Sequence, residues 1–319
     1  MWKFMGSSQF SKLAPLLVLV EFLLIINVCL GSARKLTSLY QPPPMALTYH
    51  GGALLQGDLP VSIFWYGTFS PAQKSIVADF LLSLNSNPHT DAITVKPSVN
   101  QWWNTVQTYM KKAGQKQTHV SLSTQLSDHN CTIGKTLKKS QISELAHRVN
   151  PASSGGLTLV LTAPDVAVEG FCMSNCGFHN SDRRSDSVFI WVGNSATQCP
   201  GQCAWPFHQP IYGPQTPPLV APNADVGMDG MVVNIATLLA GTVTNPFANG
   251  YYLGSAEAPL EVASACTGVY GKGAYPGYAG ELLVDSSSGA SYNAVGVNGR
   301  KYLLPALFDP YTSQCETIV

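Results

Sequence analysis

Two cysteine pairs with the same spacing constrain this chain more than any other feature. Cys172 and Cys176 have three residues between them, as do Cys199 and Cys203, and 22 residues separate the two pairs. Four thiols placed in this way form disulfides or bind a zinc ion, although structural zinc sites usually use closer spacing in at least one pair. The compartment in which the chain folds decides between the two, because disulfides persist where conditions are oxidising.

The N-terminus indicates that compartment. Lys3 and Lys12 precede an apolar run over residues 14–30, and small residues follow it. This order is typical of a secretory signal peptide, here residues 1–33. A membrane anchor is the alternative, but the run has only 17 residues, near the lower limit for crossing a bilayer, and Glu21 lies in its middle. We therefore expect a protein that is secreted to the extracellular space and has no membrane association once the signal is removed.

Secretion favours disulfides over zinc. Cys29 would leave with the signal peptide, and Cys131 would then be the odd thiol of those that remain. The cysteines expected to form disulfides are Cys172, Cys176, Cys199, Cys203, Cys266 and Cys315. A bridge between the last two is one expectation, and connectivity stays open at this level. The stretch Asn130-Cys131-Thr132 is a glycosylation sequon, and a glycan on Asn130 would place this segment on the surface of a glycoprotein.

Composition narrows the class of function. Only 11% of the residues are charged, against roughly 25% in typical soluble domains, and the formal net charge is zero. A neutral chain has no surplus of cations for phosphate groups, so binding to nucleic acid or to a membrane surface is not expected. Hydrophobic residues make up 45% of the chain, which is enough for a substantial core.

Periodicity predicts alternating strands and helices after an extended arm at residues 34–60. Runs of β-branched and aromatic residues predict strands at 61–66, 120–126, 157–162 and 188–192. Apolar residues at helical spacing predict helices at 71–84, 98–112, 141–149 and 228–243. This alternation indicates an α/β fold, here a single layered mixed-sheet domain over 61–319. Its C-terminal half is expected to be loop-rich and disulfide-bonded, with short strands at 281–284 and 301–304.

Few patterns in the chain carry chemistry. It has no GxSxG elbow, P-loop, GxGxxG turn after a strand, EF-hand loop or HExxH helix. Glu144 and His147 share one helical face, but an exposed pair is far commoner at that spacing than a metal site. His179 and His208 lie near the cysteine pairs, where an imidazole more often packs on a loop than binds metal. No metal, cofactor or catalytic residue is therefore predicted.

Aromatic residues have two interpretations. They could form stacking platforms for sugars, because their rings combine an apolar face with a polar edge. The residues concerned are Trp102, Trp103, Trp205, Tyr251, Tyr252, Tyr270, Tyr275 and Tyr278. Most aromatic side chains pack in cores and loops, so the pattern alone does not establish a sugar site.

Several short segments of distinctive composition run along the mature chain. They are residues 47–52 (LTYHGG), 61–67 (VSIFWYG), 171–179, 190–194 (IWVGN), 203–208 (CAWPFH), 243–246 (VTNP), 256–260 (AEAPL), 275–277 (YPG) and 299–302 (GRKY). Together, and in this order, they resemble the plant EXORDIUM (phosphate-induced protein 1) family. The resemblance implies a secreted apoplastic protein tied to cell expansion and growth, often responsive to brassinosteroid or nutrients. It does not imply a settled enzyme activity.

One departure from the family pattern concerns metal binding. Some members, and similar microbial proteins, carry a His-Glu-x-x-Glu stretch on the helix before an Asn-Pro or Asp-Pro. In a zincin-like fold such a helix supplies a metal-binding imidazole, a general-base carboxylate and a further metal-binding carboxylate. Here these positions fall on Thr237, Leu238 and Gly241, which offer no comparable ligands. If the ancestor was a zincin-like metallohydrolase, this matching implies that the chain kept the scaffold and lost the metal.

Three functions remain open from the sequence. We favour a non-catalytic extracellular growth regulator that binds a wall component or a receptor ectodomain. The first alternative is an apoplastic hydrolase of metalloprotease-like ancestry. The second is a structural wall protein fixed by tyrosine cross-links.

Overall fold

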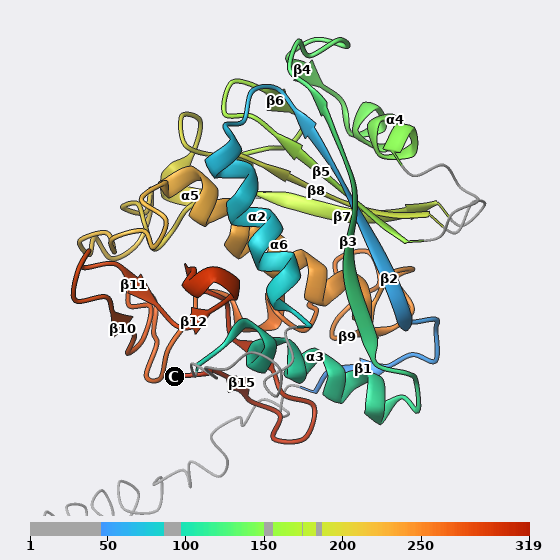
Figure 1. Ribbon diagram of the computed structural model, residues 1–319. Helices are drawn as coiled ribbons and strands as arrows, with labels where there is room; N and C mark the ends of the chain where they lie inside the picture. Colours follow the sequence, from blue (N-terminus) through green and yellow to red (C-terminus); the bar gives the residue numbers. More distant parts are fainter. Residues whose placement is uncertain (1–45, 86–96, 150–155, 174, 183–186) are drawn as a thin grey trace, which may run out of the picture. The chain divides into compact units, whose positions relative to one another are not determined.

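The computed structural model describes residues 46–85, 97–149, 156–173, 175–182 and 187–319 (Figure 1). The signal peptide expected at 1–33 and the first part of the arm expected at 34–60 lie outside these residues.

A five-stranded sheet forms the centre of the fold, in the strand order β3-β2-β5-β8-β7. The strands are β2 (Gly57–Tyr66), β3 (Thr118–Asp128), β5 (Leu157–Thr162), β7 (Gly177–Asp182) and β8 (Ser187–Gly193). The pairings among β3, β2, β5 and β8 are parallel, and β7 pairs antiparallel with β8, so the sheet is mixed. Almost every residue of β5 and β8 is buried, as expected for strands covered on both faces that read as uninterrupted apolar runs.

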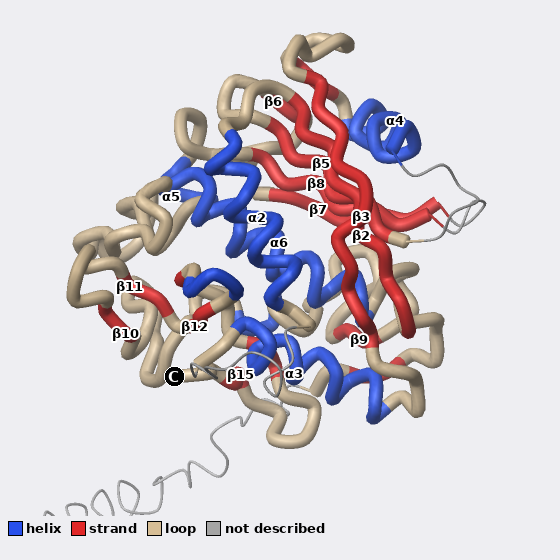
Figure 2. Tube along the Cα trace, in the orientation of Figure 1, coloured by secondary structure: helices blue, strands red, loops and turns tan. Residues whose placement is uncertain are grey.

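Helices cover both faces of this sheet (Figure 1 and Figure 2). On one face lies α4 (Lys139–Val149), and on the other α6 (Val226–Thr244) packs against β7 and β8. Two further helices, α2 (Pro71–Ser83) and α3 (Val99–Lys112), pack against α6, as does the short α5 (Pro200–Cys203). Within the described ranges, α6 is the one helix long and apolar enough to cross a bilayer, and 78% of its most apolar window is buried inside the fold.

Short strands and loops make up the part of the chain after α6. The strands there are β9 (Tyr251–Tyr252), β10 (Leu283–Val284), β11 (Ser291–Tyr292), β12 (Ala294–Val295), β13 (Lys301–Tyr302), β14 (Leu307–Phe308) and β15 (Cys315–Glu316), with the 3-10 turns η1 (Ser264–Cys266) and η2 (Val297–Gly299). Three hairpin-like pairs join β10 to β11, β12 to β13 and β14 to β15, while β9 pairs with β1 (Thr48–Tyr49). A further pair joins β4 (Thr136–Leu137), which precedes α4 in the sequence, to β6 (Ala167–Val168), which follows β5.

Local signals explain where the helices begin. The Ser70 hydroxyl accepts a hydrogen bond from the Gln73 N–H at 3.2 Å, and the Gln73 side chain accepts one from the Ser70 N–H at 3.0 Å. Such reciprocal caps contribute about 1 kcal/mol, and Pro71 fits the first helical position. Ser98 and Asp225 cap α3 and α6 by accepting hydrogen bonds from the backbone N–H groups of Gln101 and Met228.

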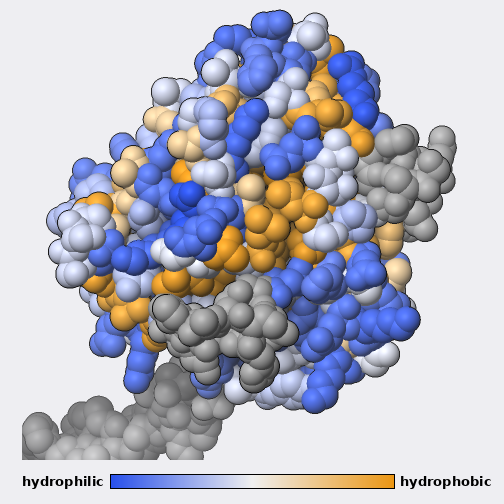
Figure 3. Space-filling model, viewed as in Figure 1, coloured by the Kyte–Doolittle hydropathy of each residue, from blue (hydrophilic) through white to orange (hydrophobic). Residues whose placement is uncertain are grey.

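The surface combines a hydrophilic helix with an apolar strip. Figure 3 shows hydrophilic side chains over α3 and apolar side chains between α2 and β3. Leu82 on α2 and Leu126 on β3 are 50% and 42% exposed.

The structure differs from the sequence-based expectation at two strands. β2 begins at Gly57, inside the stretch expected to be an extended arm, and Leu59 is already buried there. β7 occupies residues 177–182, for which the sequence analysis predicts no strand. Its sequence, GFHNSD, has no β-branched residue and much polarity, which is common in an edge strand.

Three disulfides tie the loops together. They join Cys172 to Cys199, Cys176 to Cys203 and Cys266 to Cys315. The first two connect the segment before β7 with α5, and the third connects η1 with β15. Cys131 is free and buried.

Candidate functional site

The three α6 positions matched to a metal motif present no metal ligand. The Thr237 hydroxyl donates to the Val233 carbonyl oxygen of its own helix at 2.8 Å. Leu238 lies against Gly177 of β7, where a Cβ would be 2.7 Å from its Cδ1 atom. At Gly241, the space for a side chain is taken by the carboxylate of Glu261. These residues do not fit a zinc site of the His-Glu-x-x-Glu type, and no zinc-dependent step follows from them.

Glu261 is the centre of a buried polar cluster beside α6. Both carboxylate oxygens lie 3.0 Å from Nε2 of His179, and Asn245 Nδ2 donates to Oε1 at 2.8 Å. The Asn245 side-chain oxygen accepts from the Gly250 N–H at 2.8 Å. The side chains of His179 and Glu261 are only 16% and 10% exposed. The cluster therefore fastens β7, the end of α6 and the loop before η1 to one another.

The hydrogen bonds of this cluster fix its chemistry. Since a carboxylate only accepts, His179 must carry a proton on Nε2 to bond Glu261. Its Nδ1 is buried with no partner within the described part of the chain. The two side chains are thus bonded to each other. The sequence analysis missed Glu261 because the residue that makes room for it is Gly241, which has no side chain to contribute to a pattern.

The other two candidate histidines, His147 and His208, lie on separate parts of the fold. Glu144 is exposed and His147 is half-buried on α4, while His208 is exposed with Nδ1 3.0 Å from the Gln209 carbonyl oxygen. The described residues contain no group of three His, Cys, Asp or Glu side chains placed to hold a metal ion.

The sequon lies on the surface. Asn130 is exposed in the turn that follows β3. The Thr132 hydroxyl of the same sequon donates to Asp128 at 2.6 Å.

Most of the aromatic residues considered for sugar stacking belong to the core. Trp102, Trp103, Tyr251, Tyr252 and Tyr270 are buried. Trp205 is half-buried. Tyr275 and Tyr278 lie at the surface, where they are 64% and 38% exposed and their ring centroids are 5.1 Å apart.

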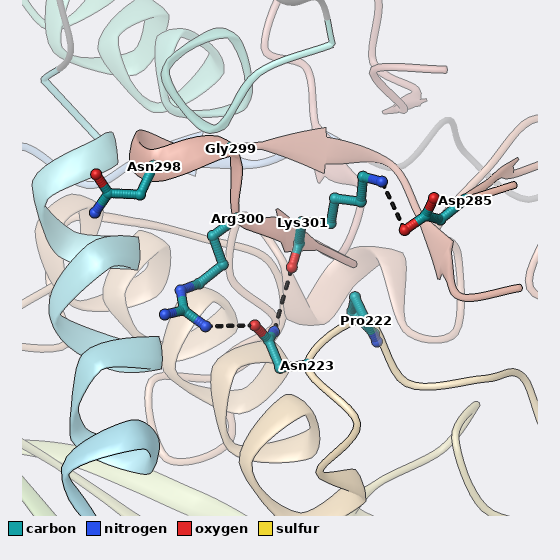
Figure 4. A pocket seen from close by; sticks show the side chains of 7 residues that line it. All are labelled: Pro222, Asn223, Asp285, Asn298, Gly299, Arg300 and Lys301. Atoms are coloured by element: carbon teal, nitrogen blue, oxygen red, sulfur yellow. Dashed lines mark hydrogen bonds and ion pairs between the residues drawn. The ribbon is translucent and has the colours of Figure 1, made fainter. Parts of the chain in front are cut away.

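A polar pocket of about 340 Å³ lies in the C-terminal part of the fold (Figure 4). Its lining residues are Pro222, Asn223, Asp285, Asn298, Gly299, Arg300 and Lys301. Figure 4 shows the side chains of Arg300 and Lys301 leaving the same short segment in different directions. We call this site the Arg300 pocket. Residues 299–302 contribute to the family resemblance, but no pattern in the sequence marks them as a site.

Arg300 is held rigidly at the wall of the pocket. Its Nε donates to Asp79 at 2.8 Å, one terminal nitrogen to Asn223 at 2.8 Å and the other to Ser75 at 3.0 Å. Two of these partners come from α2 and one from the loop before α6, and the Arg300 side chain is 25% exposed. A guanidinium fixed by several partners keeps one orientation, which suits recognition of a ligand.

Lys301 and Asp285 form the opposite side of the site. The Lys301 Nζ atom lies 2.8 Å from Asp285 Oδ2 and 5.0 Å from the centre of the Tyr292 ring. The hydrogen bonds from Lys301 and then from Ser287 and Ser288 hold the pKa of Asp285 far below its usual range. Arg300 and Lys301 each have a carboxylate partner, so the charges around the pocket are balanced.

Asp229 lies behind the pocket and contacts it through Asn223. Its two oxygens accept from the Asn223 side-chain amide at 2.6 Å and the Asn223 backbone N–H at 2.9 Å. Burial raises the pKa of Asp229 to about 7. Asn223 also donates to the Lys301 carbonyl oxygen at 3.2 Å, so it joins Asp229 to both basic residues of the pocket.

Comparison with known proteins gives a consistent result. The family model described as phosphate-induced protein 1 conserved region matches residues 47–318. The chain is 54% identical to Protein PHOSPHATE-INDUCED 1 of Nicotiana tabacum, over 99% of this chain and 100% of that protein. It is 52% identical to Protein EXORDIUM of Arabidopsis thaliana, over 93% of this chain and 97% of that protein. Protein EXORDIUM-like 2 of Arabidopsis thaliana is 54% identical, over 88% and 92%.

No solved structure matches the chain. The α/β class is seen directly in the sheet and its helices, whereas a zincin-like fold is not confirmed.

Proposed function

The chain belongs to the phosphate-induced protein 1 family, and we propose that it is a secreted regulator of plant cell expansion and growth of the EXORDIUM type. In this proposal the protein acts in the apoplast without catalysis, by binding a wall component or a cell-surface partner such as a receptor ectodomain. Its production or activity responds to brassinosteroid or nutrients, as the family resemblance implies.

The Arg300 pocket is the observation that carries the binding role. It is an open, polar site lined by side chains fixed by hydrogen bonds, with Arg300 bonded to Asp79, Asn223 and Ser75. Rigid polar groups around a cavity are typical of ligand sites. Secretion is supported by the leader-like N-terminus and by three disulfides, which are stable outside the cytosol.

The buried polar cluster around Glu261, beside α6, supports a role without catalysis. A general acid or base must reach the substrate proton within hydrogen-bond distance. His179 and Glu261 are instead buried and bonded to each other. Thr237, Leu238 and Gly241 add no imidazole or carboxylate beside them.

One experiment tests secretion and growth regulation together. Full-length protein and a form lacking residues 2–33 are expressed in plant seedlings, and extracellular fluid, wall fraction and cell length are measured. We expect the full-length form outside the cell, with altered cell length, and the shortened form inside it without effect. Intracellular retention of the full-length form, or an equal effect of both forms on cell length, would contradict the proposal.

A hydrolase is the second candidate, favoured by the residue types of His179 and Glu261, and it requires that the two side chains separate and become accessible to substrate. Imidazole and carboxylate are the usual residue types of general acid–base catalysis. Turnover of wall polysaccharide or peptide by the secreted protein, abolished in a folded Glu261→Gln variant, would support this alternative over binding alone.

A structural wall protein is the third candidate, favoured by exposed tyrosines. Tyr212 and Tyr275 are 88% and 64% exposed and therefore open to oxidative cross-linking. Release of the protein from walls by salt alone would count against it.

A further inference from the structure

The Arg300 pocket contains hydrogen-bond donors that the protein leaves unused. Arg300 bonds Asp79, Asn223 and Ser75 through one N–H each, and a guanidinium has more N–H groups than these. Lys301 bonds Asp285 through one of the N–H groups of its ammonium. The remaining N–H groups belong to side chains that line the pocket (Figure 4).

The acceptors around the pocket are, by contrast, largely occupied. Asp285 accepts from Lys301, from Ser288 and twice from Ser287. Both hydrogens of the Asn223 amide are used, and its oxygen accepts from Arg300. The amide oxygen of Asn298 remains as an acceptor, since its nitrogen donates to Asp79 at 3.3 Å. A complementary ligand must therefore present several oxygen acceptors to the pocket, while most of its own donors face water at the mouth.

The charge balance restricts the ligand further. Arg300 is paired with Asp79 and Lys301 with Asp285, each at 2.8 Å. A multiply charged anion such as phosphate would meet these two carboxylates without a surplus of positive charge to offset them. The affinity for an uncharged ligand is not reduced by this balance of charges around the pocket. Hydroxyl oxygens are uncharged acceptors that can also donate to the Asn298 oxygen.

The size and mouth of the pocket fit a piece of a sugar chain. Its volume of about 340 Å³ lies at the lower end of the range of about 300–1,000 Å³ for small-molecule sites. Asn298 and Gly299 have φ values of 59° and 69°, so the chain turns sharply before Arg300. A Cβ at Gly299 would meet nothing within 4 Å, which leaves the mouth open for a chain that continues beyond the pocket.

We propose that the Arg300 pocket binds a neutral saccharide unit, with the N–H groups of Arg300 and Lys301 donating to its hydroxyl oxygens. This inference rests on the proposed extracellular binding role and names the ligand class for that role. Because the ligand is uncharged, its affinity depends little on salt, whereas affinity for an acidic sugar would fall as salt screens the attraction.

Calorimetric titration of the secreted, disulfide-bonded protein tests the proposal. The probes are cellotetraose and a xyloglucan oligosaccharide as neutral sugars, and tetragalacturonate as an acidic one, in 50 and 500 mM NaCl. We expect a neutral probe to bind equally well at both salt concentrations. Lys301→Gln should weaken this binding about tenfold, because one charged donor is lost. Lys301→Arg keeps a donor and should retain most of the affinity.

The matched control is Lys272→Gln, which makes the same change at an exposed lysine outside the pocket and should leave affinity unchanged. Failure of both neutral probes to bind, equal binding by Lys301→Gln, or salt-sensitive binding of tetragalacturonate alone would each overturn the proposal.

Binding to isolated walls distinguishes failure of the saccharide proposal from failure of the proposed extracellular binding role. If the protein binds walls and Lys301→Gln binds equally well, the pocket assignment fails and the binding role stands, whereas no wall or cell-surface binding at all contradicts the proposed function itself.

Discussion

Gly241→Ala gives the sharpest test of the cluster beside α6. In an ordinary helix interior, Ala is more favourable than Gly by about 1 kcal/mol. At position 241, however, the added Cβ would lie well inside 3.0 Å of Glu261 Oε2, and that carboxylate is fixed by His179 at 3.0 Å and Asn245 at 2.8 Å. Displacing a buried carboxylate from hydrogen bonds such as these costs about 3 kcal/mol. We therefore expect Gly241→Ala to destabilise the protein by about 2 kcal/mol.

The sign of the effect should reverse when Glu261 is shortened. In a Glu261→Ala background only the Cβ of residue 261 remains near the new methyl group, at the 3.5 Å that separates it from a Cβ at 241. That distance is an ordinary contact, so Gly241→Ala should then stabilise by up to about 1 kcal/mol. Urea unfolding followed by far-UV circular dichroism, with the disulfides intact, measures all four proteins. Stabilisation by Gly241→Ala in the unaltered protein, or the same destabilisation in both backgrounds, would refute the packing described for Glu261.

Three further predictions follow from the site and its surroundings. Burial of Asp229 raises its pKa to about 7, above its unfolded value of 3.8, so its contribution to stability is complete below pH 4 and is lost as pH rises through 7. Between pH 5 and 8 the unfolding free energy should fall by about 2 to 3 kcal/mol from this group, and Asp229→Asn should flatten that fall; an unchanged slope would contradict the assignment. Replacing Cys266 and Cys315 by Ala removes a bridge across 49 residues and should cost about 4 kcal/mol in denaturant unfolding, and an unaltered midpoint would contradict it. Protein purified from a plant host without chelator should contain no stoichiometric zinc by mass spectrometry, whereas one zinc per chain would redirect attention to His147, His179 and His208.

Local sequence signals were enough to predict most of the helices and strands that position the sites. Ser70 and Pro71 define the start of α2, and the run LTLVLT is β5 without any shift in its bounds. The buried, β-branched strands and the long apolar α6 carry strong patterns because most of their residues are buried in the fold. β7 was missed because an edge strand of polar residues has no such pattern.

The sites themselves depend on contacts between residues far apart in the sequence. His179 and Glu261 are 82 residues apart, and Arg300 reaches Asp79 across 221 residues. No spacing rule connects such partners, and Gly241 contributes by lacking a side chain. The adjacent Arg300 and Lys301 gave no distinct signal, because Lys111 with Lys112 and Lys138 with Lys139 are similar basic pairs in the same chain. Only the fold shows which residues Arg300 and Lys301 contact.

Binding to isolated plant cell walls tests the central claim most directly. The secreted protein, Lys301→Gln and Lys272→Gln are titrated onto purified wall material, and the bound fraction is measured at each concentration. We predict saturable binding by the unaltered protein and by Lys272→Gln, and binding about tenfold weaker by Lys301→Gln. Saturable binding that is the same in all three proteins, or no saturable binding by any of them, would contradict a wall-binding role for the Arg300 pocket.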